Sequence, residues 1–298
     1  MCNTVIGHKK QKDFFQKIIA GNRLSHSYIL SGVSGIGKFL FAKELARSIF
    51  CQRGSFFEEC SCSSCLQVQE NTYPDLYIYE GSDLKVENIR SISEAASMTG
   101  LVSKWKIFIL RDAEKLSNSG LIVAGNAFLK TLEEPGENNL FLLITSKYDM
   151  IMPTIRSRCS LVNFSPLNID EVKEIYSLKR GNSENTDSII SMSGGSMERA
   201  FMLDDLKAHD ILDYIIKKDF KSFTAYFLDL NDIWIIKAVM EIIYTYTLER
   251  YKKDSQNKYI IYGDYILEIL QRLNYNINID LTKHDFVSKT IEVFSERI

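Results

Sequence analysis

The segment 31–43, SGVSGIGKFLFAK, has the residue types and spacing of a phosphate-binding loop. In such a loop glycines let backbone N–H groups surround the phosphates, a lysine reaches the terminal phosphates, and the next residue gives Mg²⁺ a hydroxyl ligand. Here that next residue is Phe39, which cannot ligate a metal. The sequence therefore predicts a nucleotide site that lacks one metal ligand. Its candidate nucleotide-binding residues are Gly32, Gly35, Gly37 and Lys38.

Four of the six cysteines cluster in residues 51–65, CQRGSFFEECSCSSC. The polar N-terminal sequence has no apolar signal region, so we do not expect a disulfide framework. Closely spaced thiols in such a chain are typical of a tetrahedral Zn²⁺ site. A cysteine-rich surface loop without metal is the alternative. The candidate zinc ligands are Cys51, Cys60, Cys62 and Cys65.

The overall charge argues against a protein whose main role is to coat nucleic acid. The chain has 36 Lys+Arg and 38 Asp+Glu among 298 residues, a formal net charge of −2. Contact with DNA would then come from a local patch or through a partner. The apolar runs are short or interrupted by charge, so no membrane-spanning segment is expected. We expect a soluble cytoplasmic protein.

The elements around the glycine loop follow a strand–loop–helix order. The strand candidate HSYILS leads into the loop, and the amphipathic segment KFLFAKELARSIFC follows it. Further along, KIFIL and LFLLIT are unbroken apolar runs typical of buried parallel strands. Strands that alternate with helices predict an α/β fold with a parallel sheet, with the site at the C-terminal ends of its strands. Beyond Pro166 the sequence predicts helices only.

Several segments resemble the AAA+ subunits of the bacterial sliding-clamp loader of DNA polymerase III. The most specific are NAFLKTLEEP at 126–135 and TIRSRC at 154–159, supported by HSYILSGVSGIGK and the cysteine cluster after its helix. The chain departs from the family in one cysteine spacing and in extra residues near Gly120–Val123. The resemblance implies three domains. These are a P-loop AAA+ domain over 1–165 with an inserted zinc module at 51–65, a helical lid over 166–208, and an all-α collar for oligomerisation over 209–298.

Within this family, three positions argue against ATP hydrolysis. Active members end a buried strand in Asp-Glu, for Mg²⁺ and for the attacking water, whereas this chain has Arg111 and Asp112 there. In the lid motif, Glu198 occupies the position of the phosphate-contacting arginine. Arg199 follows it, rotated by about 100° on a helix. Together with Phe39, these losses imply that nucleotide chemistry is abandoned or reduced to weak binding.

The resemblance therefore points to the non-hydrolysing, delta prime type of clamp-loader subunit. Arg158, in TIRSRC, would be an arginine finger that acts on ATP bound by a neighbouring subunit. Thr145 occupies the family's nucleotide-sensing position. The implied partners are the gamma/tau motor and delta subunits, with the sliding clamp and primer-template DNA reached through the complex. Zn²⁺ is the expected cofactor, and binding of ATP with Mg²⁺ is doubtful.

Two other functions are consistent with parts of the sequence. An active gamma/tau-type ATPase would need Mg²⁺ ligands where this chain has Phe39 and Arg111. A zinc-dependent nucleic-acid-binding protein would need basic and aromatic residues around the cysteines. The segment RGSFFEECSCSSC instead carries two glutamates and one arginine.

Overall fold

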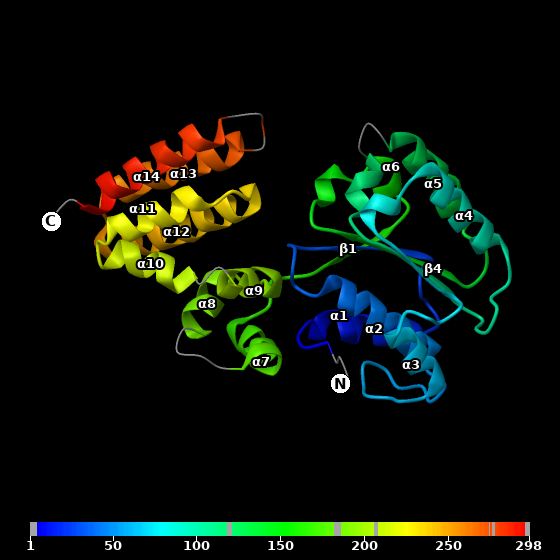
Figure 1. The fold of residues 1–298 in the computed structure, drawn as a ribbon. Coiled ribbons are helices and arrows are strands. Elements are labelled where there is room, and N and C mark those ends of the chain that lie inside the picture. The colour runs from blue at the N-terminus through cyan, green and yellow to red at the C-terminus, as the bar shows by residue number, and fades with distance from the viewer. Residues whose placement is uncertain are drawn as a thin grey trace. The chain divides into compact units, whose positions relative to one another are not determined.

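The computed structural model describes residues 5–117, 121–181, 186–205, 208–273, 275 and 278–295. The chain forms two compact units (Figure 1). The first comprises Met1–Ile175 and Gly195–Met197, and the second comprises Tyr176–Gly194 and Glu198–Ile298. The division into three domains that the resemblance implies stays a prediction.

The first unit is built on a parallel five-stranded sheet with the strand order β2-β3-β4-β1-β5. The predicted strands in HSYILS, KIFIL and LFLLIT are confirmed as β1, β3 and β4. The fifth strand was not predicted, because only Val162 of its four residues is buried and the segment has no apolar run. The strands are β1 (Ser27–Ser31), β2 (Leu76–Tyr79), β3 (Lys106–Leu110), β4 (Asn139–Thr145) and β5 (Ser160–Asn163).

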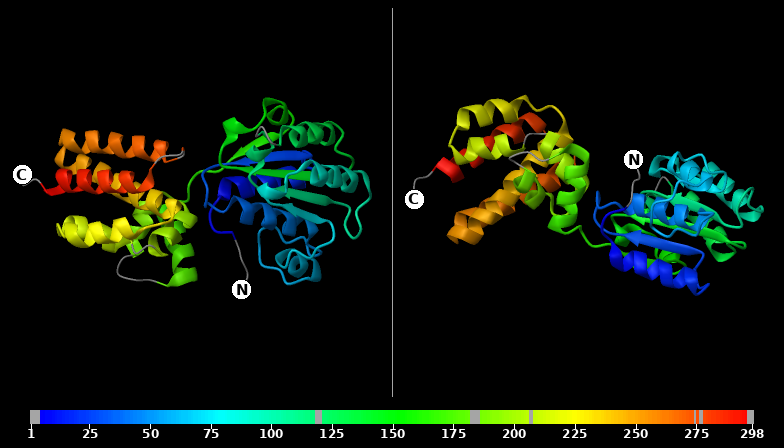
Figure 2. Two further views of the ribbon diagram at one scale, coloured as in Figure 1. Left: turned by 45° about the horizontal axis from the view of Figure 1, so that its top comes forward. Right: turned by 90° about the horizontal axis from the view of Figure 1, so that it is seen from below.

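Helices cover both faces of this sheet (Figures 1 and 2). Successive residues of a strand point to opposite faces, so Tyr28 and Leu30 join the core under one helix layer while Ile29 joins the other. One layer contains α1 (Lys9–Ala20), α2 (Lys38–Phe50) and α3 (Ser63–Gln69), and the other contains α4 (Val86–Ser97) and α5 (Ile122–Glu133). Burial on both faces explains why the central strands read as continuous apolar runs.

Short helical elements connect the strands and helices of this unit, and two of the extra residues near Gly120–Val123 belong to α5. Helix α5 begins at Ile122 and continues through the NAFLK segment, so Ile122 and Val123 lie in its first turn. Residues 118–120 lie outside the described part of the chain. The connecting elements are η1 (Gly81–Asp83), η2 (Ala113–Ser117), η3 (Tyr148–Met150) and α6 (Pro153–Arg156).

The second unit consists of helices, as the sequence predicts. Its core includes Phe223, Phe227, Tyr262 and Phe286, all fully or almost fully buried. In the described part of the chain no helix is long and apolar enough to cross a membrane. The remaining helices are α7 (Ile169–Arg180), α8 (Thr186–Ser193), α9 (Met197–Asp205), α10 (Ala208–Ile216), α11 (Phe220–Asp229), α12 (Ile233–Asp254), α13 (Asn257–Arg272) and α14 (Ile279–Ser295); α7 and α9 each have residues in both units.

Candidate functional site

The glycine loop connects the C-terminal end of β1 to the first turn of α2, as a phosphate-binding loop does. Gly35 and Gly37 have φ values of 74° and 93°, which side chains with a Cβ rarely adopt. At Gly32 an added Cβ would lie 2.4 Å from the carbonyl oxygen of Phe164. The glycine spacing noticed in the sequence is therefore required by the backbone of this loop.

The lysine of the loop is engaged by the loop itself. Lys38 is buried, and its Nζ donates hydrogen bonds of 2.6 Å to the carbonyl oxygens of Gly32 and Val33. A bound phosphate would have to replace these carbonyl oxygens as the acceptor of the hydrogen bonds from the Lys38 ammonium group. The loop thus has the form of a phosphate site, with its cation bonded to the protein.

Phe39, in the first turn of α2, and Arg111, directly after β3, contact each other. Both residues differ from those that an active ATPase would need at these positions. The guanidinium carbon of Arg111 lies 4.5 Å from the centroid of the Phe39 ring, a cation–π geometry. Arg111 Nη1 also forms a 2.5 Å ion pair with Glu80 Oε1, with both side chains partly exposed. An aromatic ring and a cation therefore meet where a hydroxyl and a carboxylate would jointly support Mg²⁺. The role of Glu80 had no signal in the sequence.

The predicted sensing residue has a buried carboxylate as its partner. Thr145 ends β4 and is paired with Ser31 of β1, which places it beside the start of the glycine loop. Its Oγ1 donates a 2.6 Å hydrogen bond to Glu114 Oε2 and accepts one of 2.9 Å from the backbone N–H of Lys147. Glu114, in η2, was missed, although a glutamate three residues after Arg111 was visible in the sequence. The Thr145 hydroxyl is thereby oriented by protein groups.

A histidine also supports the loop and was not singled out in the sequence. His8 is buried, and its Nε2 lies 2.7 Å from the carbonyl oxygen of Ile36, so this nitrogen carries the proton and donates. Burial lowers the pKa of His8 below its ordinary value of 6.5, opposed by the Ile36 hydrogen bond and by Glu171, while Lys12 and Lys38 lower it further. The neutral ring is therefore the form that the folded protein favours at neutral pH.

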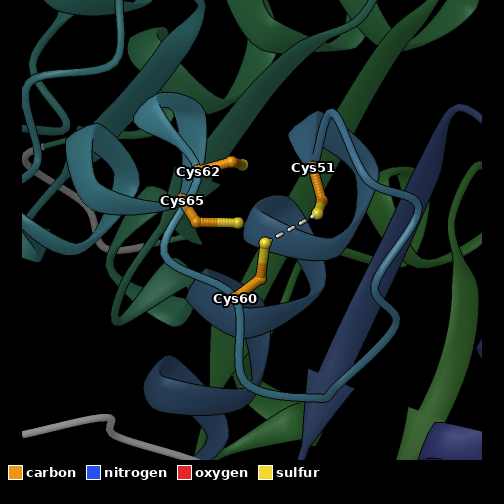
Figure 3. Close-up of side chains that lie close together, drawn as sticks. All are labelled: Cys51, Cys60, Cys62 and Cys65. Atoms are coloured by element: carbon orange, nitrogen blue, oxygen red, sulfur yellow. Dashed lines mark hydrogen bonds between the residues drawn. The ribbon is translucent and has the colours of Figure 1, made fainter.

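The four clustered cysteines converge on one point (Figure 3). Cys51 directly follows α2, Cys62 precedes α3, Cys65 lies in the first turn of α3, and Cys60 comes from the connecting loop. All four sulfur atoms lie within 4.8 Å of one another, and Cys51 and Cys60 are 3.6 Å apart. Tetrahedral zinc–thiolate bonds of about 2.3 Å need sulfur–sulfur separations of about 3.8 Å. The donor set and its spacing therefore fit one Zn²⁺ ion.

Arg158 lies at the opposite edge of the sheet from the chain's own glycine loop. The Oγ of Ser27, the first residue of β1, donates a 2.8 Å hydrogen bond to the carbonyl oxygen of Arg158, whereas the glycine loop follows the last residue of β1. A five-residue strand separates these ends by about 13 Å. The guanidinium forms a 2.5 Å ion pair with Glu133, the last residue of α5, and donates to the carbonyl oxygen of Thr154.

The displaced arginine of the lid motif is engaged within the second unit. Arg199 lies on α9, and its guanidinium contacts two residues of α12: Glu241 at 3.6 Å and the hydroxyl of Thr245 at 3.3 Å. Glu198 precedes it on the same helix. Just before Glu198, the backbone N–H of Met197 donates a 2.9 Å hydrogen bond to the carbonyl oxygen of Gly35. The glycine loop thus receives a backbone contact from the lid motif.

The sequence of the first unit is similar to known subunits of DNA polymerase III. Residues 7–168 match the family described as DNA polymerase III, delta subunit. Over 159 residues the chain is 35% identical to DNA polymerase III subunit delta' of Bacillus subtilis, which covers 52% of this chain and 47% of that protein. Over 157 residues it is 34% identical to DNA polymerase III subunit gamma of a Buchnera aphidicola strain, covering 52% and 42%. The chain spans about half the length of the curated relatives it matches.

A solved structure shares the fold over nearly the whole chain. It is a DNA polymerase III gamma subunit-related protein from Thermotoga maritima, with a TM-score of 0.56, 18% identity, and coverage of 95% of this chain and 98% of that chain. At that identity the likeness concerns the fold alone. The predicted fold class, an α/β domain with a parallel sheet followed by helices, is confirmed.

Proposed function

This chain belongs to the DNA polymerase III, delta subunit family, and we propose that it is a non-hydrolysing clamp-loader subunit of the delta prime type. The contact between Phe39 and Arg111 carries this proposal. ATP hydrolysis in a P-loop protein needs a hydroxyl and a carboxylate for Mg²⁺. Here a ring and a guanidinium lie 4.5 Å apart at those positions, so a divalent cation would meet a positive charge instead of its ligands.

The proposed contribution of this subunit to catalysis is Arg158. Its place at the opposite end of β1 from its own loop supports action on ATP held by an adjacent subunit. There the guanidinium would stabilise the charge that develops on the transferring phosphoryl group. Arginine fingers of this kind contribute about 10³–10⁵ in rate.

The proposed setting is a cytoplasmic complex that contains gamma/tau motor and delta subunits. The sliding clamp and primer-template DNA would be reached through that complex, consistent with the formal net charge of −2. One structural Zn²⁺, held by Cys51, Cys60, Cys62 and Cys65, would connect the end of α2 to α3. Bound ATP–Mg²⁺ is no part of this proposal.

An active gamma/tau-type ATPase is the second candidate, because gamma and tau subunits are among the relatives at 31–34% identity. ATP turnover by the purified chain separates the two candidates. We expect no turnover above the protein-free rate, and no change on Lys38→Ala. Robust turnover that disappears in Lys38→Ala, with a reference variant such as Lys43→Ala still active, would contradict the proposal and favour the gamma/tau type.

A further inference from the structure

Arg47 is a wholly buried arginine at the edge of the cysteine cluster. It lies in the last turn of α2, with its side chain 1% exposed. Its Nη1 donates a 3.3 Å hydrogen bond to Cys65 Sγ, and its Nη2 contacts Glu44 Oε1 at 2.5 Å and the carbonyl oxygen of Glu58 at 2.6 Å. One guanidinium therefore connects the P-loop helix, the cysteine loop and α3.

The acceptor at Cys65 is a weak one unless the sulfur is a thiolate. Burial of an unpaired arginine charge is strongly unfavourable, and Glu44 supplies one full opposite charge. A neutral thiol accepts hydrogen bonds poorly, whereas a hydrogen bond from a guanidinium to an anion is among the strong ones. Four thiolates around Zn²⁺ carry a formal net charge of about −2. The arrangement of Arg47 therefore suits the metal-bound cluster better than four free thiols.

We propose that Arg47 is a positioning residue of the zinc site, which holds the Cys65 sulfur in place and offsets part of the negative charge of the metal-bound cluster. This inference rests on the zinc site of the proposed function, and it is independent of the arginine finger. Glu44 takes part by orienting the guanidinium, because it shares Nη2 with the Glu58 carbonyl.

The surroundings of the cluster favour the same conclusion. Cys51 Sγ accepts a 3.4 Å hydrogen bond from the backbone N–H of Ser55. N–H groups that point at thiolate sulfurs are the usual outer partners of a ligated metal. Arg47 adds a charged donor, at Cys65, to this neutral one at Cys51. Two of the four sulfurs thus accept a hydrogen bond from an N–H group of the protein.

The cysteine loop is also anchored in the core of the first unit, so that loss of metal should be felt by the fold. Phe57, from the middle of the loop, is buried with its ring centroid 4.9 Å from that of Phe41 on α2. Its backbone N–H donates a 3.0 Å hydrogen bond to the hydroxyl of Ser48, also on α2. Thermal unfolding of the whole chain is therefore a suitable reporter of metal binding.

Zinc affinity of the full chain, measured by competition with a chromogenic chelator, tests the inference. Arg47→Met keeps an unbranched stem but removes the charge and the donors, and we expect a 10–100-fold loss of affinity. Arg47→Lys should lie between this variant and the natural chain. Arg53→Met is the matched control, because it removes a positive charge from an exposed side chain in the cysteine loop, six residues after Arg47. It should bind zinc as the natural chain does.

A second measurement separates positioning of the ligand from a purely structural role. A cation in the last turn also stabilises the helix without metal. In that case Arg47→Met would lower the melting temperature of zinc-loaded and zinc-stripped protein equally, with unchanged affinity. That result would overturn the inference, whereas a smaller zinc-induced rise in melting temperature supports it.

Two further outcomes are decisive. A natural chain without zinc after purification in the absence of chelator would refute the zinc site and this inference together, leaving the arginine-finger proposal untouched. If Arg47→Met does not fold, Arg47→Lys decides. It keeps the charge but loses the planar fork that donates to Cys65 and Glu58 at once, and we expect a three- to tenfold weaker zinc affinity, below the full effect of losing an outer partner. An unchanged affinity in Arg47→Lys would then count against the inference.

Discussion

Replacement of Arg158 by alanine should abolish catalysis at one neighbouring ATP site while leaving the subunit folded. The side chain is about one-third exposed, and its ion pair with Glu133 lies at the surface. Such pairs contribute about 0–1 kcal/mol, so the free energy of unfolding should change by no more than that. An arginine finger, in contrast, contributes 10³–10⁵ in rate, or about 4–7 kcal/mol of transition-state stabilisation. The catalytic effect should therefore far exceed the effect on stability.

The small energy of the surface ion pair also predicts a small effect of Glu133→Gln. Release of the guanidinium from Glu133 costs at most about 1 kcal/mol, which corresponds to about a fivefold change in rate. Glu133→Gln should therefore alter turnover by less than about fivefold, while Arg158→Lys should rescue poorly because an ammonium lacks the planar fork.

The assay is DNA- and clamp-stimulated ATP turnover by a reconstituted clamp loader. With all motor sites intact, the loss in Arg158→Ala should be partial, because other sites are served by other arginines. When the motor sites that do not receive Arg158 are inactivated, the loss of ATP turnover should approach the full factor of at least about 10³. Arg156→Ala is the matched control: Arg156 contacts Asp149 and Tyr148 in the same segment and has no proposed catalytic role. Unchanged turnover and clamp loading by Arg158→Ala in assembled complex would refute the finger assignment.

Three other predictions concern the first unit. Cys60→Ser should reduce bound zinc, measured by elemental analysis, and lower the melting temperature of the chain; retention of one zinc per chain would contradict the ligand set. His8 should make stability pH-dependent: its pKa is lowered by burial, so its contribution is full above pH 6.5 and lost as pH falls below it. Urea midpoints of His8→Phe should therefore fall less between pH 7 and pH 5.5 than those of the natural chain, and equal falls would refute this. Asp75→Ala should lower the free energy of unfolding by about 3–5 kcal/mol, because the buried Asp75 carboxylate accepts three backbone hydrogen bonds from residues 101–103. A loss below about 1 kcal/mol in chemical denaturation would show that water replaces the carboxylate.

Features that depend on neighbours along the chain could be predicted from the sequence alone. The glycine loop was recognisable because φ values of 74° and 93° need glycine at Gly35 and Gly37, and the next helix starts at Lys38. The cysteine cluster was recognisable because all its ligands fall in residues 51–65, so a short loop and one helix turn suffice to bring them together. The central strands were recognisable because burial on both faces leaves unbroken apolar runs.

Only the tertiary structure decided which of these residues act on one another. Phe39 and Arg111 are 4.5 Å apart because α2 and the end of β3 meet at one edge of a sheet whose order is β2-β3-β4-β1-β5. The partners of Arg158 and Thr145, which are Glu133 and Glu114, likewise come from elements distant in the chain. In a parallel sheet, neighbouring strands are joined by long crossovers, so strand order and register set these pairings. Residue types and local spacing do not specify the strand order of the sheet. The contacts between residues distant in the chain, such as Phe39 with Arg111, are therefore known only from the assembled sheet.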